Sequence, residues 1–248
     1  MKSMRRLSDI LCVFRIQLIS MRAEIGPFLL AALVFPSAMY LFAKAVSGSE
    51  ATLPTQLRFL AGSIVFSLSL TSISWLGYLL LENRFTGRLK LFATLPLAPS
   101  SYICGFLLFA FVQASVATTT LLLVGKVFGV QVRPSLLSLA LVVILTVLCL
   151  CGLGTVIAAC ARSFTEGSLL TDACGAGLVF LAPVYYPPEM MPRALRGASQ
   201  ILPTAFAADG VQAALSGSYA VGTQVIVLGL MSVFTLGFGF RLTNWRQN

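Results

Sequence analysis

The chain has 248 residues, of which 58% are hydrophobic and only 10% are charged, and its mean hydropathy is +0.93. This composition excludes an ordinary soluble domain and predicts an all-α integral membrane protein. The formal net charge is +9 and the sequence has no histidine, so it lacks the commonest general base and metal ligand.

The N-terminal segment has the pattern of an amphipathic helix that lies on a membrane surface. Apolar residues recur at helical spacing within residues 7–18, and arginines flank them on both sides. We therefore expect an interfacial helix over about 5–23 on the inner leaflet, with a positively charged tail as the alternative. The segment lacks a compact apolar core followed by a small-residue cleavage site, so we do not expect a removable signal peptide. The apolar residues are Leu7, Ile10, Leu11, Phe14 and Leu18.

Six hydrophobic segments are candidates for membrane spans. A spanning helix needs roughly 20 predominantly apolar residues, and the rest of the chain has no room for a separate soluble domain. Residues 1–248 are therefore expected to form a single transmembrane domain. The predicted spans are about 26–43, 59–81, 101–125, 135–160, 167–183 and 219–240.

The basic residues predict the orientation of these spans. Eleven of the 17 Lys and Arg residues fall on the side that carries both chain ends and residues 82–102. Because basic loops stay on the cytoplasmic side, both termini should be cytoplasmic in a multi-pass protein of the cell membrane. The net positive charge would then reflect topology and contact with anionic lipid, and the interleaved basic and aromatic surface of a nucleic-acid-binding protein is missing.

Residues 82–102, ENRFTGRLKLFATLPLAPSSY, form the most unusual polar interruption. Charged residues come first, an apolar face follows, and prolines end the segment, which predicts a short amphipathic helix lying across the axis of the spans. Its apolar side would dock on a protein or on lipid headgroups; otherwise the segment is a connector that only fixes topology. The residues are Glu82, Arg84, Arg88 and Lys90, then Leu89, Leu91, Phe92 and Leu95, then Pro96 and Pro99.

Polar residues within the spans concentrate in the second and fifth segments. Asp172 is an ionisable group inside a predicted membrane helix, which makes it a functional candidate. A substrate or proton role competes with a structural one, in which Asp172 reaches water or Arg162 near the helix end. The polar residues are Ser67, Ser69, Thr71, Ser72, Ser74, Thr171 and Asp172.

The region 183–214 contains four prolines in its first ten residues, which stop a continuous span. The short helical patterns that follow predict a pair of short helices dipping into the outer face. A plain outer loop is the alternative.

No catalytic or metal constellation is present in the sequence. A phosphate-binding loop of the form GxxxxGK[ST] and a Ser/His/Asp or Cys/His arrangement are both missing. The cysteines lie mainly in hydrophobic runs, and Cys149 and Cys151 would diverge on a helix, so neither catalytic nor metal-binding residues are expected.

The stretch 82–102 closely resembles the signature of type 2 ABC-transporter permeases. In that family an acidic residue precedes a glycine, a Leu-rich stretch, a Leu-Pro pair and a tyrosine that opens the third span; here these are Glu82, Gly87, residues 89–95, Leu95-Pro96 and Tyr102. The later PPEMMP and ILPT stretches, residues 187–192 and 201–204, resemble the family's outer re-entrant region. The resemblance covers nearly the whole chain, with Gly87-Arg88 in place of the family's common Gly-Thr pair.

This resemblance implies a half-transporter in which two permease chains, identical or different, meet around a central pathway. A separate ABC ATPase subunit would bind ATP and Mg and attach at the cytoplasm, so the chain itself would carry no cofactor and would not be an enzyme. Residues 82–96 would be the coupling helix, and the substrate would be an exported drug, lipid or other amphiphile. The implied coupling residues are Glu82, Arg84, Gly87, Arg88, Leu91, Phe92 and Pro96.

The pathway is expected between two permease chains, because one chain offers few intramembrane polar groups. Its predicted lining comes from the second and fifth spans: Ser69, Ser72, Thr171 and Asp172. The alternative function is a secondary transporter or channel-like membrane protein without an ATPase partner.

Overall fold

Every regular element that the computed structural model describes is a helix. The described residues are 2–23, 25–48, 52–88, 94, 99–186, 191, 196–197, 199 and 201–242. In chain order the elements are α1 (Lys2–Ala23), α2 (Ile25–Leu29), η1 (Leu30–Val34), α3 (Phe35–Ser47), α4 (Leu53–Ser69), η2 (Leu70–Trp75), α5 (Leu76–Phe85), α7 (Pro99–Val127), α8 (Leu136–Cys160), α9 (Phe164–Leu181), α11 (Pro203–Leu215) and α12 (Gly222–Leu242).

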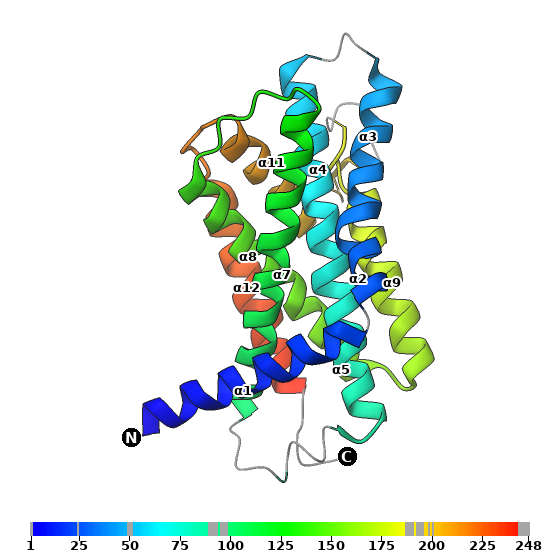
Figure 1. The fold of residues 1–248 in the computed structure, drawn as a ribbon, viewed down its shortest axis with the longest axis vertical. Coiled ribbons are helices and arrows are strands. Elements are labelled where there is room, and N and C mark those ends of the chain that lie inside the picture. Colours follow the sequence, from blue (N-terminus) through cyan, green and yellow to red (C-terminus); the bar gives the residue numbers. More distant parts are fainter. Residues whose placement is uncertain are drawn as a thin grey trace.

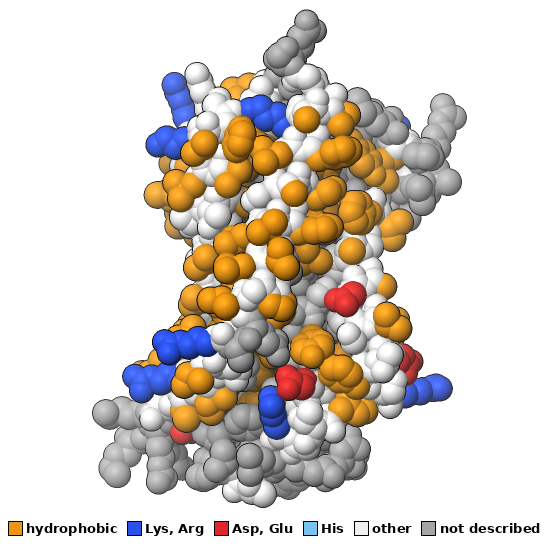
Figure 2. All heavy atoms as spheres, turned by 45° about the vertical axis from the view of Figure 1, so that its right-hand side comes forward, with side chains coloured by type: hydrophobic (Ala, Val, Ile, Leu, Met, Phe, Trp, Pro, Cys, Tyr) orange, Lys and Arg blue, Asp and Glu red, His pale blue; other side chains and the backbone are white. Residues whose placement is uncertain are grey.

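The long helices form an elongated bundle, and α1 lies across one of its ends (Figure 1). The last turns of α12 are at the same end as α1, whereas α11 is at the opposite end. Apolar side chains cover the waist of the molecule, and basic side chains gather toward its two ends (Figure 2). This distribution is typical of a bundle whose middle lies in hydrocarbon.

Five helical segments are long and apolar enough to cross a membrane. They coincide with five of the six predicted spans. The sixth prediction, 167–183, falls on α9, which has only 18 residues and carries Glu166 and Asp172, so its apolarity is lower than that of the others. The helices therefore establish five candidate spans rather than six. The five are Ile25–Ser47, Leu53–Phe85, Ser101–Val127, Leu136–Cys160 and Gly222–Leu242.

The first two spans each contain a stretch of π-helix, η1 and η2, and these two stretches contact each other. The hydroxyl of Ser67 donates to the carbonyl oxygen of Ala32 at 2.6 Å, and the rings of Phe28 and Trp75 meet edge to face at 5.7 Å. A π-helical turn carries one extra residue and often occurs at functional sites. Here it turns Trp75 toward the first span.

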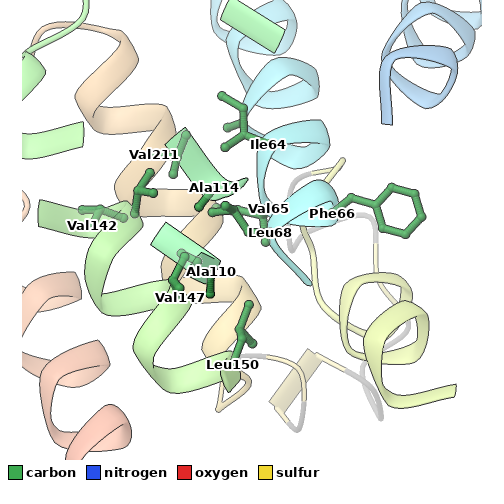
Figure 3. Packing of buried hydrophobic residues seen from close by; sticks show 14 of the residues in the cluster. Ile64, Val65, Phe66, Leu68, Ala110, Ala114, Val142, Val147, Leu150 and Val211 are labelled. Carbon is green, nitrogen blue, oxygen red and sulfur yellow. The ribbon is translucent and has the colours of Figure 1, made fainter. Parts of the chain in front are cut away.

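Leu53–Phe85 is the central helix of the bundle. In its apolar stretch 78% of the residues are buried, against 17% in Gly222–Leu242, so the latter lies at the periphery. Val65 and Leu68 of α4 lie close to Ala110 and Ala114 of α7, whereas Phe66 points away from them (Figure 3). Small residues on α7 let its backbone approach α4, which is how helices associate in lipid.

The amphipathic helix α1 packs on α7 rather than standing free. Val13 is completely buried, and a Cβ atom on Gly105 would lie 2.7 Å from the Val13 side chain. Gly105 thus allows α1 to cross α7 closely. The helix predicted over about 5–23 is present and has a packed side.

Candidate functional site

The end of α5 holds the described part of the predicted coupling element. The backbone N–H of Thr86 donates to the carbonyl oxygen of Glu82 at 2.9 Å, and its hydroxyl donates to the same atom at 2.6 Å. Gly87 follows with φ +78°, in the left-handed region that favours glycine. The chain therefore leaves the helix by a tight turn at Gly87.

An ion pair closes this turn. Arg88 Nη1 lies 3.1 Å from Glu82 Oε1, and the two side chains are 55% and 22% exposed. A pair this open to solvent contributes little stability. Both groups therefore keep hydrogen-bonding capacity toward a partner.

Arg84 points instead into its own chain. Its Nη1 donates to the carbonyl oxygens of Ala158, Ala159 and Ala161 at 2.8–3.1 Å, at the C-terminal end of α8. Its guanidinium also lies over the Phe85 ring, 5.3 Å from the centroid. A cation at this position satisfies helix-end carbonyl groups and the helix dipole. Arg84 thus fastens α5 to α8, and contact with an ATPase stays a prediction for this residue.

The other predicted coupling residues, Leu91, Phe92 and Pro96, lie outside the described residues. Their place in a docking helix stays a prediction.

Three of the four predicted pathway residues are buried inside the chain. Ser69, Ser72 and Thr171 are at most 1% exposed. The Ser69 hydroxyl donates to the carbonyl oxygen of Gly175 at 2.7 Å, so it holds α4 against α9. At Gly77 a Cβ atom would lie 2.5 Å from the methyl group of Thr171, which shows how closely α5 approaches α9. These residues form a helix contact, and the described structure does not present them to an open conduit.

Asp172 lies next to Thr171 in sequence but is exposed. No ion pair or hydrogen bond of Asp172 with Arg162 is found among the described residues. The Arg162 backbone N–H donates to Glu166 Oε2 at 3.1 Å, and the Glu166 N–H donates to the Ser163 hydroxyl at the same distance. This cap begins α9 and leaves Asp172 on the free face of the helix.

Comparison with known protein families identifies the chain. Residues 10–216 match the family described as ABC-2 type transporter. The chain belongs to this family. The match confirms the resemblance that the 82–102 stretch indicated, and it identifies a membrane subunit of an ABC transporter, which is a transport subunit rather than an enzyme. No curated protein matched the chain.

Membership of the family suggests what the ends of the central helix of this permease contact. ABC-2 membrane domains work in general with an ABC ATPase, which binds the nucleotide. The turn at Gly87 is the part of the described chain that resembles the ATPase-contacting element.

A charge network that was not predicted from the sequence lies at the opposite end of the central helix. Arg58, near the start of α4, is 8% exposed. It donates through Nη1 to Asp209 Oδ1 at 2.5 Å and to Gln212 Oε1 at 2.9 Å, and through Nη2 to the carbonyl oxygen of Pro183. Asp209 and Gln212 are three residues apart on α11, a spacing that presents both to one partner and could have signalled the contact.

This network fixes the short helix α11 to the permease core. Thr204 at its start is buried and donates to the carbonyl oxygen of Leu178 in α9 at 2.6 Å. Nearby, burial raises the pKa of Tyr185 to about 12, against the smaller opposing effect of its hydrogen bond with Ser63. Tyr185 therefore stays neutral. The predicted short helices of 183–214 are represented by α11; most of 187–200 lies outside the described residues.

The described residues contain no group of three or more His, Cys, Asp or Glu side chains placed to hold a metal ion. Cys149 and Cys151 are buried and free.

Proposed function

We propose that this ABC-2 permease is the membrane subunit of an exporter that moves an amphiphilic or lipid-like substrate or a drug out across the cytoplasmic membrane. ATP is hydrolysed by a separate ABC ATPase subunit, and a second permease chain completes the pathway. The family match over residues 10–216 carries the proposal.

The proposed topology has six spans with both termini cytoplasmic, and α9 is the sixth. Support comes from the packing of α9 along η2, α5 and α4, and from the exposure of Leu169, Phe180 and Leu181 on it. Exposed apolar side chains of this size on a membrane helix are expected to face lipid or a second chain. Cysteines introduced at Ser47, Arg133 and Ser218 should react with an impermeant reagent from outside; reaction from the cytoplasm at any of them would contradict the topology.

In the proposed coupling, residues 82–96 transmit movement of the ATPase to the spans. The element joins directly to α5, and α5, η2 and α4 form one helix of 33 residues. A rigid helix carries a displacement along its length, whereas a flexible connector would dissipate it. Movement at the Gly87 turn would thus reach the opposite end of the bundle.

The proposed pathway lies along the face of α9 that bears Asp172, between two permease chains. Asp172 is exposed there, which supports a role in the lining. Ser69, Ser72 and Thr171 would meet substrate only when the contact of η2 with α9 opens.

Purification of the tagged permease from native membranes tests the function. An ABC ATPase should copurify, and the reconstituted complex should move an amphiphile out in an ATP-dependent manner. Transport driven by an ion gradient, with no ATPase bound, would instead establish a secondary transporter.

The coupling role has its own test within that reconstituted complex. Phe92→Ala and Arg88→Glu should lower substrate-stimulated ATPase activity while membrane insertion stays normal. Phe128→Ala removes an exposed phenylalanine (46% exposed) from the other end of α7 and is the matched control. Full substrate stimulation of the ATPase activity in both coupling variants would contradict the coupling role of residues 82–96.

A further inference from the structure

A pocket of about 290 Å³ lies between α1, η2, α5 and α7, beside the turn at Gly87. Neither the family match nor the proposed pathway accounts for it. One of its walls is α1, which crosses the end of the bundle (Figure 1).

Along η2 and α5 the lining of the pocket changes from apolar residues to polar and charged ones. Glu82 and Arg88 line the polar end, whereas Trp75, Leu79 and Phe109 contribute apolar surface. Trp75 precedes Glu82 by seven residues along one helix, which is roughly 10 Å at 1.5 Å per residue. This matches an amphiphile with its headgroup near Glu82 and its chain toward Trp75.

Trp75 lines this pocket, and its side chain has a hydrogen-bond donor without a partner in the described part of the chain. Its indole Nε1–H is buried and has no partner among the described residues. Buried donors are nearly always satisfied, and Trp has no other polar atom. Gln17 of α1, which is only 4% exposed, lines the same pocket with its amide group.

The charges at the polar end define the headgroup. Glu82 and Arg88 are of opposite sign, 3.1 Å apart and partly exposed, so each can accept a further partner. A phosphate complements the Arg88 guanidinium, and a primary ammonium donates hydrogen bonds to the Glu82 carboxylate. A quaternary ammonium has no N–H to donate, and an anionic glycerol headgroup places no cation against Glu82.

We propose that this pocket binds phosphatidylethanolamine, with the phosphate on Arg88, the ammonium group on Glu82 and the glycerol esters toward Trp75. The occupant comes from the bilayer, because one wall of the pocket is α1, an amphipathic helix that crosses the end of the bundle where the membrane surface is expected (Figure 1). The bound lipid touches α1, α5 and Arg88 together, so it holds the coupling turn against the interfacial helix. The inference rests on membership of the membrane subunit family and not on the substrate or direction of transport.

The two tryptophans of the chain allow a direct test. Trp245→Phe in the full-length permease leaves Trp75 as the single fluorophore, and the protein is reconstituted in phosphatidylcholine vesicles. Increasing fractions of dibrominated phosphatidylethanolamine, phosphatidylcholine or phosphatidylglycerol should quench Trp75 according to occupancy of the pocket. We expect about tenfold preference for phosphatidylethanolamine over phosphatidylcholine, the order of one charge-assisted hydrogen bond. In Trp75→Phe, which retains Trp245, quenching should show no headgroup preference.

Variants test whether Glu82 and Arg88 cause the preference for phosphatidylethanolamine. Glu82→Gln should abolish the preference for phosphatidylethanolamine over phosphatidylcholine. Arg88→Gln should weaken the binding of both lipids. Glu166→Gln and Arg15→Gln change the same charges outside the pocket and should behave as the parent. Equal quenching by the three lipids, or tighter binding of phosphatidylglycerol, would overturn the proposal.

A second measurement needs no pocket variant. Successive N-methylation of the headgroup should lower affinity stepwise, and soluble glycerophosphoethanolamine should compete at least about tenfold less well than the lipid, because it lacks the chain that contacts Leu79 and Phe109. Competition as strong as that of the lipid would show that a free headgroup, rather than a bilayer lipid, is the ligand.

Discussion

The two ends of the central helix, Leu53–Phe85, are built in opposite ways. At one end Arg58 is buried and donates to three groups that belong to α11 and to the end of α9. At the other end Glu82 and Arg88 form a single, partly exposed pair beside a glycine turn. A buried charge without its partners is costly, so the Arg58 end is held in one arrangement. The open pair leaves the Glu82 end free to meet other molecules.

The central helix is thus held firmly at its Arg58 end and loosely at its Glu82 end. A displacement imposed at the Glu82 end would turn the helix, and α11 would move with it because Arg58 bonds to Asp209 and Gln212. Arg84 adds a fixed point just inside the open end, because it binds α5 to the end of α8. The predictions below test how firmly each part is held.

The largest effect is expected from Arg58→Met, which keeps apolar volume but removes all three hydrogen bonds. Gln212 and the Pro183 carbonyl lose a donor, and the half-exposed Asp209 loses its ion pair. We expect the purified permease to lose about 2–4 kcal/mol of stability, measured by unfolding in mixed detergent micelles. Arg133→Ala makes the same charge change at an exposed site of the same end and should change stability by less than about 0.5 kcal/mol. Equal losses of stability in the two variants would show that the bonds of Arg58 contribute no more than an exposed charge, and the Arg58 end would then not be held more firmly than the Glu82 end.

The helix between the two ends should be sensitive to added volume. Gly77→Ala places a methyl group 2.5 Å from the Thr171 methyl group and should destabilise by about 1–3 kcal/mol. Thr171→Ser removes that methyl group, so the double variant should recover part of the loss. Strictly additive losses in this cycle, measured by the same unfolding assay, would mean that the two residues are not in contact.

Loss of the Arg84 contact is expected to have an intermediate effect. Arg84→Ala leaves the carbonyl groups of Ala158, Ala159 and Ala161 without their shared donor and should lower stability by about 1–2 kcal/mol. Hydrogen exchange should increase at the end of α8 and remain unchanged in α11. Increased hydrogen exchange in α11 alone would show that Arg84 does not act by holding the end of α8.

The smallest effect on stability is expected at the open pair. Arg88→Gln should change the unfolding free energy by less than about 1 kcal/mol, because the pair is exposed to solvent. Exchanging the charges, with Glu82→Arg and Arg88→Glu in one chain, restores the pair but presents the wrong charges to a partner. We therefore expect the exchanged chain to fold normally and to lose ATPase stimulation. Normal stimulation would mean that the pair serves the chain alone.

Much of the fold was predictable because hydrophobic runs bounded by Pro, Gly and charged residues define membrane helices. The boundaries of Leu136–Cys160 and Gly222–Leu242 agree with the predicted spans to within about three residues. The second span was predicted too short, since the helix continues at both ends past charged residues that are hydrogen-bonded within the protein: Arg58 and Arg84. The π-helical stretch in that span was not predicted, because a single extra residue per turn hardly changes the hydrophobic pattern.

The candidate site could be predicted only where its residues lie close together in the sequence. The charges, the glycine and the prolines of 82–99 stand close together in sequence and indicated a turn and a helix. The polar residues of the second and fifth segments were predicted to line a pathway, and this stays a prediction; what the sequence did not show is that Ser69 and Thr171 lie buried against a neighbouring helix. Periodicity shows that a residue lies on one face, but it does not show which helix covers that face.

The sequence by itself determined the all-helical membrane class, five candidate spans and the amphipathic α1, because these follow from composition and from patterns within about 20 residues. The family was indicated by the resemblance of residues 82–102 to its signature. Only the tertiary structure decided that Arg58 meets Asp209 across 151 positions, that Thr171 fills the space left by Gly77, and that α1, α5 and α7 enclose a pocket. Such contacts depend on how helices distant in sequence dock, and in lipid this is governed by close packing and hydrogen bonds rather than by hydrophobicity alone.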